Sequence, residues 1–501
     1  MSMCSQEYDA PDLIQRGESV SCSGKLRISS MFQGEKKLPV NRQYDLAVIG
    51  SGPAGQKAAI QGAKLGKQVA IVDRADCVGG ICIHHGAIPS KSLREAILYF
   101  TGFYHRQTYG ARHQKDLTMR ELMDRCAQVE SNETQLVLDQ LERNRVEFIE
   151  GEASFDNDHT LTVRDVERTF EIVADVVIVA TGTSPSRPPS IPFEDGVVVD
   201  SNGLTTLKEL PKSLIVVGTG VIGTEYASML ALLRIQVTLV DQRPVILDFV
   251  DQEIAEALTY HMRDIGVVLH LGEEVISIEK GQNGKVCATF KSGKKVFGDA
   301  LLYAAGRQGA TANIGLDKIG VKTDQRGRIQ INEHYQTNLP HIYAVGDVIG
   351  FPSLASSSME QGRAAACHAF GVAVQHRPHL IPYGIYTVPE ISMVGQNEKQ
   401  LIQQEVPYEI GIARYREIAR GQILGDKVGM LKLLFHQDSR QILGVHAIGQ
   451  GATELIHIGQ TAMAFNGTID YFIENTFNYP TLAECYRVAG LNGYNKIVVA
   501  G

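Results

Sequence analysis

The feature that most constrains the fold is a pattern that occurs twice in this chain of 501 residues. In each copy an apolar run, typical of a buried parallel strand, leads into a loop with the spacing GxGxxG, a helix and a second apolar strand. In the first copy the first strand lies at 44–50 and the second strand ends at Asp73; in the second copy these are 214–218 and Asp241. The loop glycines are Gly50, Gly52 and Gly55 in the first copy and Gly218, Gly220 and Gly223 in the second. A repeat of this length predicts two related α/β domains rather than a solenoid.

Each copy carries the features of a dinucleotide site. The first glycine allows a tight turn, the second lets the backbone approach a pyrophosphate, and the third permits close packing of helix against strand. The pyrophosphate then lies at the helix N-terminus, and the acid that follows takes the hydroxyls of the adenosine ribose. Glycines used only for packing would not explain Asp73 and Asp241. Two such sites facing each other are typical of one FAD and one nicotinamide cofactor.

Composition excludes several classes of protein. A formal net charge of -8 argues against a nucleic-acid surface, which needs an excess of basic residues. No apolar run approaches the roughly 18 residues of a membrane span, and residues 1–40 form a polar extension without the apolar core of a signal peptide. The scattered cysteines form neither a secreted disulfide framework nor zinc-ligand pairs, and the adjacent His84 and His85 cannot share one helix face. We therefore expect a cytoplasmic protein that binds small dinucleotides, with no metal site, no membrane contact and no nucleic-acid partner.

Several motifs outside the loops resemble those of the flavoprotein disulfide reductases, the family of glutathione reductase and dihydrolipoamide dehydrogenase. The resemblance covers residues 43–497. The motifs are GGIC at 79–82, PSK at 89–91, ATG at 180–182, AAGR at 304–307, YAVGD at 343–347 and PTLAE at 480–484. The resemblance implies an α/β fold with two Rossmann-like dinucleotide-binding domains, for FAD and NAD(P), and a C-terminal α+β dimerisation domain.

The resemblance also divides the chain into segments. After the extension at 1–40, the FAD-binding domain takes residues 41–185 and a return segment at 309–377, the NAD(P)-binding domain takes 186–308, and the dimerisation domain takes 378–501. An alternating run at 430–435 and a helical stretch at 453–465 indicate an α+β domain in the last segment. We expect a homodimer or larger homo-oligomer through this segment.

Individual residues receive roles by the same resemblance. Lys91 lies beside the flavin N5 and pairs with Glu225, so both are candidate catalytic residues; a solvated helix lysine is the alternative for Lys91. A helix over 354–370 directs its N-terminus at the flavin, with Ala355 and Ser356 as backbone donors. The other candidates for FAD are Gly50, Gly52, Gly55, Asp73, Gly80, Cys82, Gly182 and Asp347. The candidates for NAD(P) are Gly218, Gly220, Gly223, Glu225, Asp241, Arg243 and Gly306.

Two departures from the family pattern decide the expected activity. The family's redox pair is CxxxxC, but here Cys82 is followed by Ala87 at the second position. The family's proton-shuttling histidine is replaced by Tyr479, a poor base at neutral pH, and we interpret Tyr479 and a helix capping box at Thr481 and Glu484 as structural. Because a disulfide relay needs two sulfurs and a base, hydride transfer between nicotinamide and flavin is what remains.

The runs GAIPSK at 86–91 and FNYPTLAECYRVA at 477–489 resemble the transhydrogenase branch of the family. That branch implies a ping-pong reaction, NADPH + NAD+ to NADP+ + NADH, through tightly but non-covalently bound FAD. One alternative is a disulfide oxidoreductase in which Cys77 replaces the missing sulfur; another is a flavin- or nucleotide-binding protein without turnover. Cys82 is interpreted as a small apolar contact against the flavin, with a lone thiolate as its alternative.

The residues after the second acid indicate how one site accepts both nicotinamide cofactors. Asp241 takes a free 2′-hydroxyl and repels a 2′-phosphate, whereas Arg243 reaches the phosphate when one is present. An acid alone favours NAD, and a base alone favours NADP. Having both predicts a site that tolerates each cofactor; the alternative is that Arg243 points to solvent.

Overall fold

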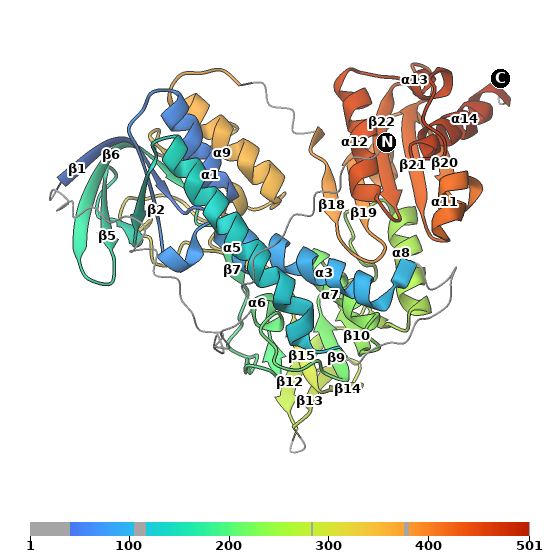
Figure 1. The fold of residues 1–501 in the computed structure, drawn as a ribbon, viewed down its shortest axis with the longest axis horizontal. Coiled ribbons are helices and arrows are strands. Elements are labelled where there is room, and N and C mark those ends of the chain that lie inside the picture. Colours follow the sequence, from blue (N-terminus) through green and yellow to red (C-terminus); the bar gives the residue numbers. More distant parts are fainter. Residues whose placement is uncertain (1–40, 105–116, 282–283, 375–379, 500–501) are drawn as a thin grey trace, which may run out of the picture. The chain divides into compact units, whose positions relative to one another are not determined.

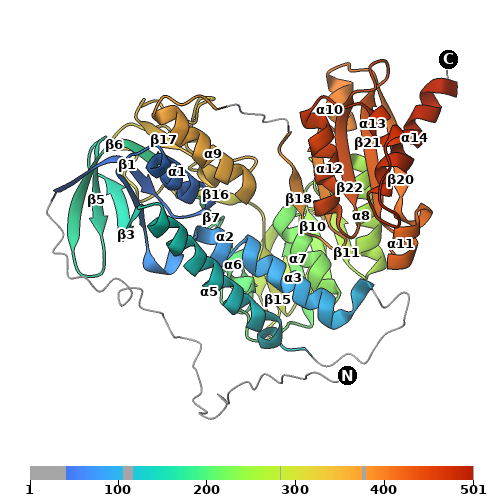
Figure 2. The same ribbon diagram turned by 45° about the horizontal axis from the view of Figure 1, so that its top comes forward.

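The computed structural model describes residues 41–104, 117–281, 284–374 and 380–499 (Figures 1 and 2). The predictions for residues 1–40 lie outside these ranges. Within the described ranges, no helix is both long and apolar enough to cross a membrane.

The first repeat builds a seven-stranded sheet with the strand order β3-β2-β1-β6-β5-β4, in which β17 pairs with β6. Strands β3, β2, β1, β6 and β17 pair in parallel, so their carboxyl ends lie at one edge of the sheet. The strands are β1 (Asn41–Ile49), β2 (Val69–Asp73), β3 (Glu147–Glu150), β4 (Glu152–Phe155), β5 (Thr160–Arg164), β6 (Thr169–Val179) and β17 (Ile342–Ala344). Because β17 comes late in the chain, the segment after residue 309 returns to this sheet, as the resemblance implies.

Two helices lie side by side against the first sheet, α1 (Pro53–Lys64) and α9 (Ala355–Ala369) (Figures 1 and 2). Gly362 allows their close approach, since a Cβ there would lie 2.0 Å from the carbonyl oxygen of Ala54. The other helices of this part are α2 (Gly80–His84), α3 (Ala87–Thr101) and α5 (Met119–Arg143). The helix predicted over 354–370 is thus confirmed, one residue shorter at each end.

The second repeat builds a five-stranded parallel sheet with the order β11-β10-β9-β15-β8. Its strands are β8 (Val198–Val199), β9 (Ser213–Val217), β10 (Gln236–Asp241), β11 (Val268–Leu271) and β15 (Ala300–Tyr303), and its helices are α6 (Ser201–Leu204), α7 (Val221–Ala231) and α8 (Gln252–Asp264). A separate antiparallel sheet holds β12 (Val275–Lys280), β13 (Val286–Phe290) and β14 (Lys295–Gly298). The chain passes between the two repeats where β7 (Thr183–Pro185) pairs with β16 (Arg307–Gly309). These short strands lie at the predicted boundaries after 185 and 308, which stay predictions.

The last part of the chain is a five-stranded antiparallel sheet with the order β18-β19-β22-β21-β20. Its strands are β18 (Tyr383–Ile385), β19 (Ile391–Gly395), β20 (Tyr408–Arg414), β21 (Met430–His436) and β22 (Ile442–Ile448). Its helices are α10 (Glu398–Gln403), α11 (Ala419–Leu424), α12 (Ala452–Ala464), α13 (Ile469–Glu474) and α14 (Glu484–Val499). Helix α12 packs on β19 and β22, and α14 packs on β20 and β21, so this is the α+β arrangement predicted for the tail.

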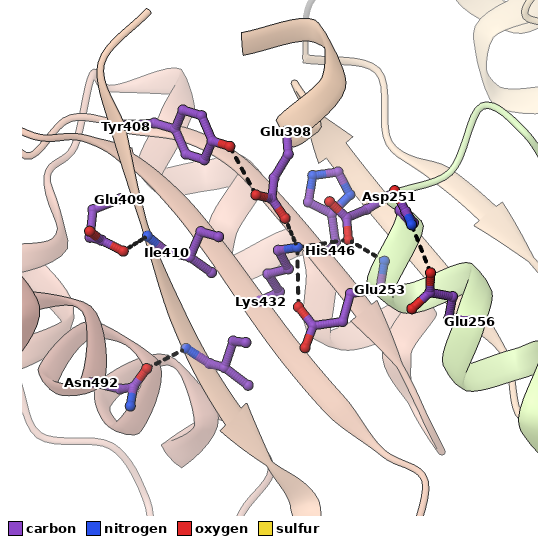
Figure 3. A network of polar contacts seen from close by, with 12 residues as sticks. Asp251, Glu253, Glu256, Glu398, Tyr408, Glu409, Ile410, Lys432, His446 and Asn492 are labelled. Carbon is purple, nitrogen blue, oxygen red and sulfur yellow. Dashed lines mark hydrogen bonds and ion pairs between the residues drawn. The ribbon is translucent and has the colours of Figure 1, made fainter. Parts of the chain in front are cut away.

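A buried lysine joins the last sheet to the second repeat (Figure 3). The side chain of Lys432 on β21 is 0% exposed, and its ammonium lies 2.9 Å from Asp251, 3.2 Å from Glu253 and against Glu398. Asp251 is also the N-cap of α8, where its side chain accepts the N–H of Glu253. A charge buried this deeply needs opposite charges around it, so the contact fixes the start of α8 against β21.

One hydrophobic core connects α3, the second sheet and the last sheet. It contains Leu93 and Ile97 of α3, Tyr226 of α7, Ile385 of β18 and Met430 of β21, all of them buried. This packing places α3 beside α7 and β18, where the candidate catalytic residues lie.

Candidate functional site

The first glycine loop, between β1 and α1, needs its glycines for different reasons. Gly50 has φ +103°, and a Cβ there would lie 2.4 Å from the carbonyl oxygen of Ala180. A Cβ on Gly55 would lie 1.9 Å from the carbonyl oxygen of Gly50, so α1 packs directly on the loop. Gly52 is the N-cap of α1, and a Cβ on Gly80 would lie 2.7 Å from its Cα. The loop therefore has the tight turn and the close packing that the sequence predicts.

The second loop has the same geometry between β9 and α7. Gly218 has φ +111° and its Cβ would lie 2.7 Å from the carbonyl oxygen of Ala304, while a Cβ on Gly223 would lie 1.9 Å from the carbonyl oxygen of Gly218. Gly220, the N-cap of α7, and Gly306, after β15, have no heavy atom within 4 Å of their Cβ positions. That open space is what a pyrophosphate needs to approach the backbone.

The first acid is held by the residue that follows the first glycine. Asp73 Oδ2 accepts hydrogen bonds from the N–H of Ser51 at 2.6 Å and from its hydroxyl at 2.7 Å. The other carboxylate oxygen accepts the N–H of Arg74 at 2.8 Å. Burial raises the pKa of Asp73, and these hydrogen bonds act against that effect. The carboxylate thus lies directly against the nucleotide loop.

The second acid has an equivalent partner and an additional cation. Asp241 Oδ2 accepts the N–H of Thr219 at 2.7 Å and its hydroxyl at 2.9 Å. Arg243 donates to both carboxylate oxygens, from Nε at 3.2 Å and from Nη2 at 2.9 Å. Although burial acts in the opposite direction, the hydrogen bonds from Arg243 and Thr219 lower the pKa of Asp241 to about 2. The Arg243 side chain is therefore hydrogen-bonded to the Asp241 carboxylate rather than pointing to solvent. Its contact with a 2′-phosphate stays a prediction.

The edge of the first sheet has free polar groups that fit a bound dinucleotide. Gly182, with φ +70°, has no heavy atom within 4 Å of its Cβ position. The hydroxyl of the adjacent Thr181 is buried and has no hydrogen-bond partner among the described residues. Burial raises the pKa of Asp347, which lies near Arg307 and accepts a long hydrogen bond from Thr183 at 3.5 Å. Since buried polar groups are normally paired, these groups fit the polar half of FAD.

Helix α9 presents an N-terminus without a side-chain cap. Ala355 is its first residue, and the N-cap residue Leu354 has no side-chain hydrogen bond to the helix. The first N–H groups of a helix have no partner within it and carry the positive end of its dipole. The geometry thus allows Ala355 and Ser356 to act as the backbone donors that the resemblance implies, a role that stays a prediction.

Lys91 of α3 and Glu225 of α7 form an ion pair between the two repeats. Lys91 Nζ lies 2.9 Å from Glu225 Oε2, and the two side chains are 29% and 6% exposed. The other oxygen of Glu225 accepts the N–H of Tyr386 at 2.7 Å, and the Lys91 ammonium lies 4.8 Å from the centroid of the Tyr386 ring. Lys91 is therefore not a solvated helix lysine. The pairing implied by the resemblance is present, while the catalytic role of the pair stays a prediction.

All six cysteines among the described residues are free. Burial and the nearby Asp347 raise the pKa of the Cys82 thiol, and Lys91 acts against them. Burial raises the pKa of Cys77 to about 11, even though the Arg74 guanidinium donates to its sulfur at 2.7 Å. Since both thiols are protonated at neutral pH, the structure favours an apolar contact over a lone thiolate for Cys82.

The turn before α14 differs from the prediction. The hydroxyl of Thr481 donates to the carbonyl oxygen of Asn478 at 2.7 Å, and α14 begins at Glu484. The predicted capping box is therefore wrong, because the N–H of Glu484 donates to the carbonyl oxygen of Thr481 rather than to its hydroxyl, and the helix starts too late for Thr481 to cap it. Tyr479 is 73% exposed, and Glu484 Oε2 is buried without a hydrogen-bond partner among the described residues.

Asp158, His159 and His341 bring candidate metal-ligand atoms within 4.8 Å of one another, a grouping that no sequence pattern indicated. The two imidazole rings are stacked, with centroids 4.1 Å apart and planes 11° apart. The lone pair of an imidazole nitrogen lies in the ring plane, so two nearly parallel rings cannot direct their lone pairs at one ion. His159 Nδ1 also contacts the carbonyl oxygen of Ala174 at 2.8 Å. The group is a stacked pair of histidines rather than a set of ligands.

Comparison with known proteins places this geometry in a family. Residues 44–362 match the family described as pyridine nucleotide-disulphide oxidoreductase, and residues 381–489 match its dimerisation domain. The chain belongs to this family. Relatives named soluble pyridine nucleotide transhydrogenase are 50% identical over 460 residues in Mycobacterium tuberculosis, covering 91% of this chain and 98% of that protein. The relative of that name in Salmonella gallinarum is 44% identical over 467 residues, covering 92% of this chain and 100% of that protein.

Two solved structures share the fold. A crystal structure of LpdA from Mycobacterium tuberculosis has a TM-score of 0.83 and 26% identity, covering 90% of this chain and 99% of that one. The HOCl-induced flavoprotein disulfide reductase RclA from Escherichia coli has a TM-score of 0.80 and 27% identity, covering 89% and 99%. These matches confirm the α/β fold with a C-terminal dimerisation domain. The family implies binding of FAD and NAD(P), and its dimerisation domain indicates a homo-oligomer.

Two residues of the site were missed in the sequence. Tyr386 contributes a backbone N–H to Glu225, and a backbone donor leaves no residue-type signal. Asp248 Oδ1 accepts a hydrogen bond from Nη1 of Arg243 at 3.1 Å. Its position only five residues after Arg243 could have indicated an ion pair. An acid in a loop is usually solvated, however, so the sequence alone did not favour that contact.

Proposed function

We propose that this chain transfers hydride between NADPH and NAD+, yielding NADP+ and NADH, in a ping-pong reaction at one flavin site. Bound FAD supplies the redox chemistry, because it takes a hydride from one nicotinamide and gives it to another. The relatives named soluble pyridine nucleotide transhydrogenase, which match 91% and 92% of this chain, support the activity.

The observation that carries the proposal is the presence of two complete nucleotide loops beside a single sulfur. Both loops keep their glycine geometry and their acids, and Cys82 has Ala87 where a disulfide partner would stand. A relay through sulfur needs a second thiol, and Cys77 is protonated and bonded to Arg74 instead. We also propose a cytoplasmic location, because free cysteines fit a reducing compartment.

The residues of the chain bind, align and polarise the reactants. The two loops and the N-termini of α1 and α7 hold pyrophosphates, while Asp73 and Asp241 hold ribose. The ammonium of Lys91, fixed by Glu225, places a positive charge where electron density increases during the transfer. Hydride passes between these carriers without a protein base, which agrees with Tyr479 at the position of the family's histidine.

The purified chain is expected to be yellow, with one FAD per subunit held tightly but without a covalent bond. The N-terminus of α1 at the first loop, the open space at Gly182, the Thr181 hydroxyl, which has no partner among the described residues, and the Asp347 carboxylate are the proposed contacts. The absorbance spectrum gives the stoichiometry, and release of free flavin on heating tests covalency. A colourless protein that takes up no FAD on reconstitution would contradict the assignment.

Replacing Cys82 by Ser should leave NADPH-to-NAD+ transfer within about twofold of the parent enzyme, since the proposed reaction uses no sulfur relay. The parent enzyme should reduce neither lipoamide nor glutathione disulfide at a useful rate. Both rates follow from steady-state absorbance. Loss of transfer in a Cys82→Ser protein that still carries FAD would refute the sulfur-free reaction.

We propose that the oligomer is at least a homodimer formed through the segment 381–489 and α14. An exposed tyrosine at 479 (73%), five residues before a Glu484 oxygen that is buried without a partner among the described residues, is typical of a surface completed by another subunit. Light scattering on the purified chain should give at least twice the subunit mass. A fully active monomer would rule this assembly out.

A steady-state assay separates the proposed activity from its alternatives. NADPH is supplied together with thionicotinamide-NAD+, whose reduced form absorbs at a wavelength of its own. Reduction of the analogue without added disulfide supports transhydrogenation. Turnover only with lipoamide or glutathione disulfide supports disulfide reduction, and binding without turnover supports a non-catalytic protein.

A further inference from the structure

The carboxylate of Asp241 has no acceptor position left for a ligand. Its Oδ2 accepts the N–H and hydroxyl of Thr219 and Nη2 of Arg243, at 2.7, 2.9 and 2.9 Å. Its Oδ1 accepts the N–H and Nε of Arg243, at 2.9 and 3.2 Å. An ionised carboxylate offers about four lone-pair positions, and five N–H or O–H groups already point at this one.

The equivalent acid of the first repeat is less occupied. Asp73 accepts only the N–H and hydroxyl of Ser51 and the N–H of Arg74 among the described residues. The guanidinium of Arg74 turns away and donates to the sulfur of Cys77 at 2.7 Å. Asp73 can therefore accept ribose hydroxyls directly, whereas Asp241 can do so only after the Arg243 side chain has moved off it.

Asp248 is the carboxylate that remains for Arg243 once it leaves Asp241, beside the Thr219 hydroxyl that accepts from Nη2 at 3.3 Å. Arg243 Nη1 already donates to Asp248 Oδ1 at 3.1 Å, so the guanidinium is shared between two carboxylates. The loop that carries Asp248 is fixed to the nucleotide loop, because the buried Leu247 donates its N–H to the carbonyl oxygen of Thr219 at 3.1 Å. Asp248 is thus held beside the ribose acid, and its side chain is 48% exposed.

We propose that Asp248 determines cofactor specificity at the second nucleotide site by competing for the guanidinium of Arg243. With NAD(H), the ribose hydroxyls take Asp241 and the guanidinium is retained by Asp248. With NADP(H), the 2′-phosphate takes the guanidinium from both acids. The inference rests on the proposed function, in which Asp241 and Arg243 bind the adenosine end of both cofactors.

The competition predicts opposite effects on the two cofactors. In Asp248→Asn, a 2′-phosphate meets one fewer negative charge and a guanidinium with one fewer anionic partner, so NADP+ binds more tightly. The ribose of NAD+ loses the carboxylate that retains the displaced guanidinium, so NAD+ binds more weakly. For a partly exposed pair we expect about threefold in each direction, and a change of about tenfold in the ratio of the two dissociation constants.

The test is isothermal titration calorimetry of the FAD-loaded protein with NAD+ and NADP+, which reports binding without turnover. Asp248→Asn is compared with Asp248→Glu, which keeps the charge and should restore most of the ratio. Asp264→Asn, an exposed acid at the end of α8, is the control for a change of net charge. Asp248→Ser replaces Asp248→Asn if the amide variant does not fold.

Each outcome of the titrations either supports or overturns a stated proposal. Opposite shifts of the two constants in Asp248→Asn, absent in Asp264→Asn, support the proposal. Shifts of both constants in the same direction, or no shift, overturn it, because a simple loss of negative charge tightens the binding of both anionic cofactors. If the parent protein binds neither NAD+ nor NADP+, the proposed function fails rather than the role of Asp248.

Discussion

Replacing Lys91 by Met is expected to slow the bleaching of the bound flavin by NADPH about tenfold to a hundredfold, with a smaller effect on nucleotide affinity. The range follows from a charge-assisted contact of about 1.5–3 kcal/mol, at about 1.4 kcal/mol per factor of ten. The lost charge acts on the electron density that arrives at the flavin, not on the ribose or pyrophosphate.

The environment of the pair explains why this effect should be large. Glu225 is only 6% exposed, and its two partners are Lys91 at 2.9 Å and the N–H of Tyr386 at 2.7 Å. Removing Lys91 leaves a buried carboxylate with one neutral donor at the proposed flavin site. An uncompensated buried charge of this kind is costly, and here it also opposes the arrival of negative charge.

Stopped-flow absorbance under anaerobic conditions measures the rate, and its dependence on NADPH concentration separates the limiting rate from affinity. Lys91→Arg keeps the charge and should lose less, while Glu225→Gln tests the positioning of the ammonium. Lys64→Met removes an exposed lysine of α1 and serves as the matched control. An unchanged limiting rate in Lys91→Met, with flavin content intact, would contradict the role.

Replacing Arg243 by Ala is expected to weaken NADPH binding by roughly tenfold to a hundredfold and to change NADH binding little. The phosphate loses a charge-assisted contact of about 1.5–3 kcal/mol, which gives this range. NADH has no 2′-phosphate to lose, and removal of the guanidinium frees acceptor positions on Asp241.

Asp241→Asn should do the reverse, weakening NADH and sparing NADPH. The amide has one acceptor oxygen in place of two and no charge to repel the phosphate. Dissociation constants from nucleotide fluorescence test both variants, and thermal unfolding checks that the Thr219 loop stays folded. If Arg243→Ala weakens both cofactors equally, or neither, recognition of both by this pair of residues is wrong.

The local features of the fold could be predicted from the sequence because they depend on residues that are close together in the chain. The two loops could be located from Gly50 and Gly218. Only a residue without Cβ fits there, since a Cβ would lie 2.4 Å from the carbonyl oxygen of Ala180 in the first loop and 2.7 Å from that of Ala304 in the second. The parallel strands carry continuous apolar runs, which the sequence shows directly. The pairing of Lys91 with Glu225 could be expected only through the family resemblance, because α3 and α7 are far apart in the chain.

Features that depend on packing between residues far apart in the chain could not be predicted in this way. The burial of Lys432 is one example, because its partners Asp251 and Glu398 come from other elements and a strand lysine usually faces solvent. The capping box predicted at Thr481 failed for a related reason. The TxxE spacing is present, but the N–H of Glu484 donates to the carbonyl oxygen of Thr481 instead of its hydroxyl, and the surrounding fold decides where α14 begins.

A two-step anaerobic titration of the yellow protein tests directly whether hydride passes from NADPH to NAD+ without a sulfur intermediate. One equivalent of NADPH per flavin should bleach the flavin absorbance. After removal of the nucleotide, NAD+ alone should restore that absorbance and form one equivalent of NADH. Cys82→Ser protein should give the same two steps. Absorbance that returns only when lipoamide or glutathione disulfide is added, and not with NAD+, would contradict the sulfur-free reaction.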